Sequence, residues 1–103
     1  MAVIDKHYAG LSEKFGYEIE TPEYVLNQLG YSYLGEKEIN KAIKVFKENV
    51  KRYPKSANVY DSLGEAYMKS GDKELAIKNY RRSLELNPRN ENAKHMLKKL
   101  AAD

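Results

Sequence analysis

The chain has 103 residues, enough for one domain and too few for a second core of useful size. Apolar residues make up 42% and charged residues 32%, and with three prolines and six glycines this composition favours an all-helical fold. The net charge of +3 comes from 18 basic and 15 interleaved acidic residues, which disfavours a dedicated nucleic-acid binder. The chain has no cysteine, so disulfides and thiolate metal sites are excluded, and it has no apolar run of about 18 residues that could span a membrane.

Residues 1–20 are predicted to form an N-terminal helix and a short connector. Ile4, Tyr8, Leu11 and Phe15 recur at helical spacing, and Gly16 would stop the helix. We expect this helix to cover the N-terminal face of a domain at residues 21–103. The opening lacks the apolar core of a signal peptide, so an exported natural protein would have to begin upstream of it.

Residues 23–56 and 57–90 repeat the same pattern of residues. The offset between matching positions is constant and equals the sequence separation of Val25 and Val59. Such an offset without gaps indicates a tandem repeat. The identical pairs are Val25/Val59, Leu29/Leu63, Gly30/Gly64, Tyr33/Tyr67, Ala42/Ala76, Ile43/Ile77, Lys44/Lys78 and Pro54/Pro88.

The first unit is predicted to consist of two helices. Thr21 would cap the first helix with Pro22 at its first position, where a missing N–H does no harm. A turn follows at residues 35–37, and the second helix ends before Pro54. The apolar stripes of the two helices are Val25, Leu26, Leu29 and Tyr33, then Ile39, Ala42, Ile43, Phe46 and Val50.

The second unit follows the same plan and is predicted to be closed by one more helix. Ser56 would cap its first helix, Gly71 would supply a positive φ in the turn, and Asp72 would cap its second helix. One period after Ser56, Asn90 would cap a final helix at residues 91–101. This capping helix would cover the last apolar face with a soluble surface.

The repeated residues resemble the signature of the tetratricopeptide repeat (TPR) family. They are Leu29-Gly30, Tyr33, Ala42, Phe46 and Pro54 in the first unit, and Leu63-Gly64, Tyr67, Ala76, Tyr80 and Pro88 in the second. The resemblance implies an all-α, right-handed α-solenoid of two helix pairs with an N-terminal helix and a capping helix. The chain departs from the family pattern at Asn49 and Ser83, where a small alanine is favoured, and at Lys37, where the second unit has Gly71.

A looser resemblance concerns residues 7–17 together with the two repeats. This arrangement is similar to the C-terminal TPR tail of bacterial proteins of the esterase or serine-hydrolase type. It implies an alternative function, an appendage that packs on or positions a hydrolase catalytic domain. The expected compartment depends on which of the two functions applies. We expect the cytoplasm if the chain is a whole protein, and an export compartment if it is the tail of a larger hydrolase.

The sequence offers no candidate catalytic or metal site, so we expect neither enzymatic activity nor a cofactor. His7 and His95 lie near opposite ends of the chain, and neither belongs to a histidine pair at metal-binding spacing. The chain also lacks a glycine-rich phosphate loop and an acidic calcium loop.

The family resemblance implies that the first helix of each pair lines a concave surface. We therefore predict a non-catalytic protein–protein interaction module that binds a partner peptide or domain there. A family subset grips chaperone C-terminal carboxylates with basic and amide residues. The comparable positions here hold Gln28, Ser62 and Met96, and Ser62 and Met96 cannot supply such a clamp. The predicted partner-binding residues are Tyr24, Asn27, Gln28, Tyr31, Asn58, Asp61, Ser62, Glu65, His95 and Lys99.

The second helices of the pairs are basic on their outer sides. Glu48 and Glu85 interrupt the positive stripe, so no nucleic-acid partner is expected. Two repeats are fewer than the roughly three that a free-standing array usually needs. The terminal helices, a weak homodimer contact or a preceding domain are expected to cover its ends. The basic residues are Lys41, Lys44, Lys47, Lys51, Lys78, Arg81 and Arg82.

Overall fold

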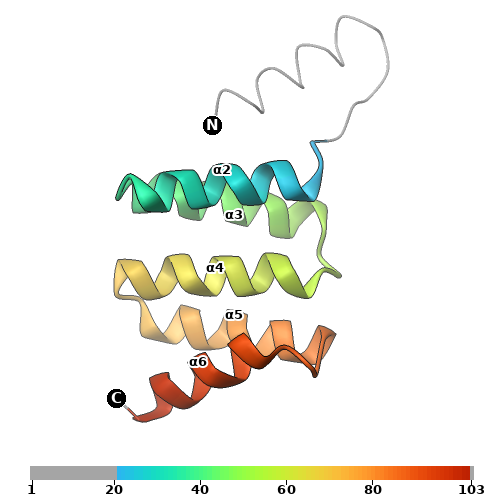
Figure 1. Ribbon diagram of the computed structural model, residues 1–103, viewed down its shortest axis with the longest axis vertical. Coiled ribbons are helices and arrows are strands. Elements are labelled where there is room, and N and C mark those ends of the chain that lie inside the picture. The colour runs from blue at the N-terminus through green and yellow to red at the C-terminus, as the bar shows by residue number, and fades with distance from the viewer. Residues whose placement is uncertain (1–20, 103) are drawn as a thin grey trace, which may run out of the picture.

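The computed structural model describes residues 21–102, which form helices and no strand. The helices stack antiparallel to their chain neighbours along the long axis (Figure 1). The prediction of an all-α solenoid is confirmed, while the predicted helix and connector at residues 1–20 lie outside the described residues. None of the described helices is long and apolar enough to cross a membrane. Their bounds are α2 (Glu23–Gly35), α3 (Ile39–Arg52), α4 (Ala57–Ser70), α5 (Lys73–Leu86) and α6 (Glu91–Ala102).

Helix α4 forms the centre of the stack. It packs on its own partner α5 and also on α3 of the preceding pair, while α6 closes the stack on α5 (Figure 1). The main core lies between these layers and combines small with aromatic side chains, so that neighbouring helices interdigitate. Its buried members are Ala42, Phe46, Leu63, Ala66, Tyr67, Ala76, Tyr80, Ala93 and Leu100.

A glycine in the first helix of each pair receives an aromatic ring from the second helix. A Cβ atom added at Gly30 would lie 2.6 Å from Cδ1 of Phe46, whose side chain is completely buried. At Gly64 the corresponding distance to Cδ1 of Tyr80 is 3.2 Å. The repeated glycines are therefore explained by close helix approach, and the contact is tighter in the first pair.

The turn between the two helices of a pair has the same hydrogen bonds in both repeats. Lys37 N–H donates to the Leu34 carbonyl at 3.0 Å, as Gly71 N–H does to Met68 at 3.1 Å. Both turns are Schellman-type helix ends, in which the closing residue adopts a positive φ. The φ of Gly71 is 87°, as predicted, and the φ of Lys37 is 63° although it carries a side chain. The first turn therefore places a lysine in the left-handed conformation that the second turn gives to a glycine.

Two of the predicted helix caps are confirmed. The Asp72 carboxylate accepts a hydrogen bond from Leu75 N–H at 3.1 Å. The side-chain oxygen of Asn90 accepts one from Ala93 N–H, also at 3.1 Å, at the start of α6. Both oxygens satisfy a donor that the first turn of a helix leaves unpaired.

The other two predicted caps are wrong in their chemistry. Pro22 lies at the N-cap position rather than inside α2, its carbonyl accepts the first backbone bonds, and Thr21 makes no capping bond. The Thr21 hydroxyl is buried without a hydrogen-bond partner. Ser56 does precede α4, but its hydroxyl donates to the Glu23 carboxylate at 3.0 Å instead of capping the helix. Competition from this carboxylate, which lies on α2, could not be foreseen from local sequence.

Asn49 and Ser83, which depart from the family pattern, tie the two helices of each pair together. The Asn49 amide donates to the Glu23 carbonyl at 3.1 Å, and the Ser83 hydroxyl donates to the Ala57 carbonyl at 2.8 Å. Glu23 and Ala57 occupy the same position in successive repeats, so both repeats make the same bond with different side chains. Both polar groups are completely buried, and this bond offsets part of the cost of burying them.

Candidate functional site

The first helices of the two pairs lie side by side and are joined by polar bonds. The Ser62 hydroxyl donates to the Asn27 side-chain oxygen at 2.6 Å, and the Tyr31 hydroxyl donates to Glu65 at 3.1 Å. Each bond joins residues that are one repeat period apart, to within a single position, so the repeat itself aligns the donors with the acceptors. The leading-helix face, as used below, comprises Glu23, Tyr24, Asn27, Gln28, Tyr31, Asn58, Asp61, Glu65, His95 and Lys99.

Most of the residues predicted to bind a partner reach the surface of this face. Tyr24 is 67% exposed, which makes it the most exposed large apolar side chain of the described residues. Ser62 is the exception, because it is only 1% exposed and its hydroxyl is engaged by Asn27. Ser62 therefore lies beneath this face and not at its surface. Gln28, Asn58, His95 and Lys99 are exposed, and Asn27, Tyr31, Asp61 and Glu65 are half-buried.

Tyr31 holds the Glu65 carboxylate in place. Its ring packs edge-on against Phe46, with centroids 5.2 Å apart and an interplanar angle of 67°. Burial and, to a smaller extent, the nearby charge of Glu65 raise the pKa of Tyr31 to about 12. The phenol therefore stays protonated at neutral pH and remains a donor to the carboxylate.

Asp61 is held by two side-chain amides at the start of α6. Asn90 donates to one carboxylate oxygen at 2.7 Å, and Asn92 donates to the other at 2.8 Å. The same Asn90 amide also donates to the Ser83 hydroxyl at 2.8 Å. Sequence reasoning identified Asn90 as a cap but missed this second use, because its carboxylate partner lies on another helix, far away in the sequence.

Glu23 was missed by the sequence prediction, although it precedes Asn27 by one helical turn. Its carboxylate accepts from Ser56 at 3.0 Å and from Asn58 at 3.5 Å, and so resembles Asp61 in its surroundings. The i, i+4 spacing to Asn27 was the signal that could have found it.

The three carboxylates of this face, Glu23, Asp61 and Glu65, are held by neutral donors. The ion pairs between described residues involve other carboxylates, namely Glu38, Glu48, Glu85 and Glu91. On the opposite side, α3 and α5 carry nine Lys or Arg residues and three acidic ones, whereas α2 and α4 carry the three carboxylates and one lysine. The two sides of the stack therefore have opposite charge.

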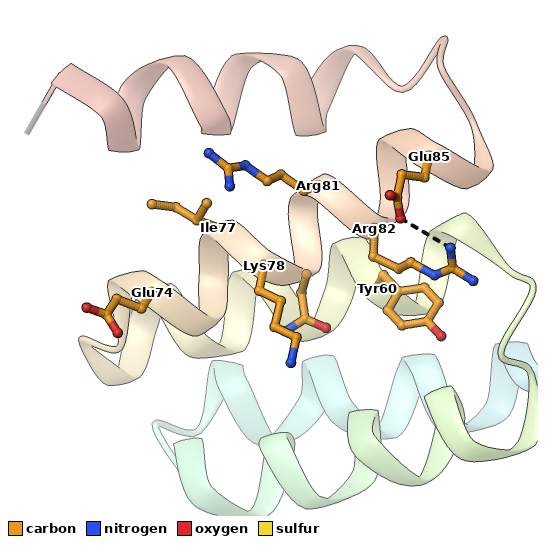
Figure 2. Close-up of a pocket in the computed structure, with 8 residues that line it drawn as sticks. Tyr60, Glu74, Ile77, Lys78, Arg81, Arg82 and Glu85 are labelled. Carbon is orange, nitrogen blue, oxygen red and sulfur yellow. Dashed lines mark hydrogen bonds and ion pairs between the residues drawn. The ribbon is translucent and has the colours of Figure 1, made fainter.

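A hollow of about 520 Å³ lies on the basic side, along α5 (Figure 2). One of the three cations that line it is already engaged: the Arg82 guanidinium lies 5.7 Å from the ring centre of Tyr60 and 3.2 Å from Glu85. The Tyr60 hydroxyl donates to the Pro54 carbonyl at 3.0 Å. We interpret this hollow as space left where Tyr60 packs against α5. Within residues 21–102 no three His, Asp or Glu side chains gather in a way that could hold a metal ion.

Two models of the tetratricopeptide repeat family match the chain, one at residues 24–56 and one at residues 57–90. The chain belongs to the tetratricopeptide repeat family. TPR arrays use the extended surface of their stacked helices for binding, so the chain is a protein-interaction module. No curated protein sequence matches it. Among solved structures, the TPR chain is similar to the first TPR of Spaghetti (RPAP3) bound to HSP90 peptide SRMEEVD, with 19% identity and a TM-score of 0.46. That match covers 78% of this chain and 90% of the other.

Proposed function

We propose that the leading-helix face binds a partner segment that carries basic side chains beside an aromatic or apolar one. The observation that supports this most directly is the row of three carboxylates, each held by neutral donors. A carboxylate that accepts only neutral hydrogen bonds keeps its full charge available to an incoming lysine or arginine. The partner can be a peptide or a segment of a folded domain.

The geometry of Asp61 and Glu65 suits this use. They lie one helical turn apart on α4, so both carboxylates face the same side. Tyr31 fixes Glu65, and the amides of Asn90 and Asn92 fix Asp61. Side chains that are already ordered lose less entropy on binding, and this increases affinity without new contacts.

Tyr24 and Gln28 would supply the rest of the contact surface at the α2 end. They are one turn apart on α2, and both are exposed. A tyrosine offers a large amphipathic area at low entropy cost, which explains its enrichment at interfaces. At the other end of the face, His95 and Lys99 are exposed on α6 and would favour an acidic group of the partner. Because the two ends of the face differ in this way, the proposed partner would bind in one orientation along it.

A peptide-display selection on the immobilised full chain tests the proposal. Selected peptides should be enriched in Lys and Arg next to an aromatic or large apolar residue. Glu65→Gln keeps an acceptor for Tyr31 but removes the charge, and it should weaken a selected peptide about fivefold to tenfold. Glu85→Gln, the matched change on the basic side, should leave affinity within twofold. Tyr24→Ser should weaken binding by a similar factor to Glu65→Gln without unfolding the chain.

Two outcomes would contradict the proposal. One is a selection without enrichment of basic residues. The other is a selected peptide that binds Glu65→Gln and Tyr24→Ser variants as tightly as the unchanged chain. In either case the partner would contact another face.

The second function considered from the sequence, an appendage of a hydrolase domain, stays a hypothesis. The matches found are to repeats alone. An antibody raised to this chain would test it by the size of the native polypeptide in its source cells. A band several times larger than 11.9 kDa would favour the appendage, and a band near that size would favour a free-standing adaptor. The weak homodimer is also still a prediction, and sedimentation of the chain at several concentrations tests it.

A further inference from the structure

A second hollow, of about 450 Å³, lies between α5 and α6, and the leading-helix face does not include it. Its floor is apolar and its rim is cationic. Figure 2 shows Arg81 extending from α5 on the side of α6. Among the residues that line the hollow, Ile77, Leu84 and Leu97 form the floor, and Arg81, Lys94 and Lys98 form the rim.

The repeat register shows what this hollow corresponds to. Leu97 and Lys98 of α6 lie one repeat period after Leu63 and Gly64 of α4, and are their counterparts. In α4 these two positions are buried, and Gly64 lies against Tyr80 of α5. The hollow on α6 is therefore the equivalent of the place that α5 occupies on α4. The second helix of a third pair would pack in this hollow.

Lys98 changes which kind of helix can pack in this hollow. The equivalent glycines, Gly30 and Gly64, leave room for the rings of Phe46 and Tyr80. A lysine side chain at that position closes the space for an aromatic ring and presents an ammonium group instead. A helix seated on α6 would therefore need a small or acidic residue where the regular TPR helices have an aromatic one.

The charges of the rim are available to such a helix. Lys94 pairs with Glu91 at 3.5 Å, but Arg81 and Lys98 take part in none of the ion pairs found between described residues. We propose that the hollow between α5 and α6 docks an amphipathic helix of a partner polypeptide. Its apolar stripe would lie on Leu97 and Leu84, and its acidic residues would pair with Arg81 and Lys98.

An amphipathic helix fits better than other anionic partners. A groove with an apolar floor between two helices takes up the apolar stripe of a third helix. Nucleic acid would use the cations but would leave the leucines of the floor exposed to water. The proposal therefore commits to a helix, and nucleic acid is treated as a competing outcome.

The test uses the full chain and two synthetic peptides that each have the length of α5. The first peptide has the sequence of α5, residues 73–86, and the second carries Lys78→Glu, Tyr80→Glu and Arg81→Glu in that sequence. Each is labelled, and its fluorescence anisotropy is followed while the chain is added. The acidic peptide should bind at least tenfold more tightly than the unchanged α5 peptide, and salt should weaken it.

Adjacent lysines of α6 provide the matched control. Lys98→Glu should weaken the acidic peptide about tenfold, whereas Lys99→Glu, the same charge change on the leading-helix face, should leave it within twofold. Lys98→Gly should weaken the acidic peptide and strengthen the unchanged α5 peptide, because it restores room for Tyr80. This last exchange of preference would not follow from a general loss of positive charge.

Three results would overturn the proposal. The acidic peptide could fail to saturate, or Lys99→Glu could weaken it as much as Lys98→Glu, which would place it on the leading-helix face. A random-sequence DNA duplex could also displace it at a lower concentration than unlabelled acidic peptide, which would make the rim a general anion surface. None of these results depends on the partner proposed for the leading-helix face, so the two proposals can fail separately.

Discussion

The substitution Gly30→Ala tests the close packing that builds each helix pair. The added methyl group would lie 2.6 Å from Cδ1 of Phe46, and carbon atoms in contact are normally about 3.5–4.0 Å apart. Phe46 is completely buried in the core, so its ring has little room to withdraw. Either the ring or the backbone of α2 must shift.

The expected magnitude is the difference between two opposing effects. Replacing glycine by alanine inside a helix stabilises by roughly 0.5–1 kcal/mol when nothing obstructs the methyl group. Overpacking a well-packed core costs about 1–3 kcal/mol. Gly30→Ala should therefore destabilise by about 1–2 kcal/mol and lower Tm by roughly 4–16 °C, at about 4–8 °C per kcal/mol for a domain of this size.

Urea and thermal unfolding followed by circular dichroism would measure this effect. Gly35→Ala is the matched control, because a Cβ atom there meets nothing within 4 Å and the unfolded chains change in the same way. It should be neutral or slightly stabilising, and Gly64→Ala, at 3.1 Å from Tyr80, should fall between the two. Adding Phe46→Leu to Gly30→Ala should recover part of the loss. If Gly30→Ala is as stable as Gly35→Ala, close approach of the ring is not the reason for this glycine.

Three further predictions concern the Lys37 turn, the Asn90 cap and the half-buried phenol of Tyr31. Lys37→Gly should stabilise the chain by roughly 0.5–1 kcal/mol in urea unfolding, because glycine adopts a positive φ without strain; a loss of stability would show that the lysine side chain matters more than its φ of 63°. Asn90→Ala should cost about 1–2 kcal/mol and speed hydrogen exchange in α6, since it removes the cap on Ala93 and a donor to Asp61; unchanged exchange in α6 would contradict this. The folded-state pKa of Tyr31 is raised to about 12 from 10.0, so its contribution to stability is complete below pH 10 and is lost as the pH rises from about 10 to 12. Tyr31→Phe should flatten stability against pH in that window, and an unchanged slope there would refute the assignment.

The sequence by itself determined the repeat and most of the helix boundaries. Local chemistry was sufficient where a residue acts within its own turn, as with Asp72, Gly71 and the Asn90 cap. The repeat period then placed Gly64 and Tyr80 in the same relation as Gly30 and Phe46. Periodicity carries this information because each TPR pair buries the same face against its neighbour.

Only the tertiary structure decided which polar groups meet across the repeats. Ser56 was predicted to cap α4, but its hydroxyl donates to the Glu23 carboxylate of α2 instead. Ser62 was placed on the binding face, and it is buried against Asn27. In both cases the partner lies on α2 of the preceding helix pair, and small rotations of one helix about its axis decide which side chains come into contact. Periodicity shows which side a residue faces, whereas its exposure and its partner depend on how closely the next helix packs.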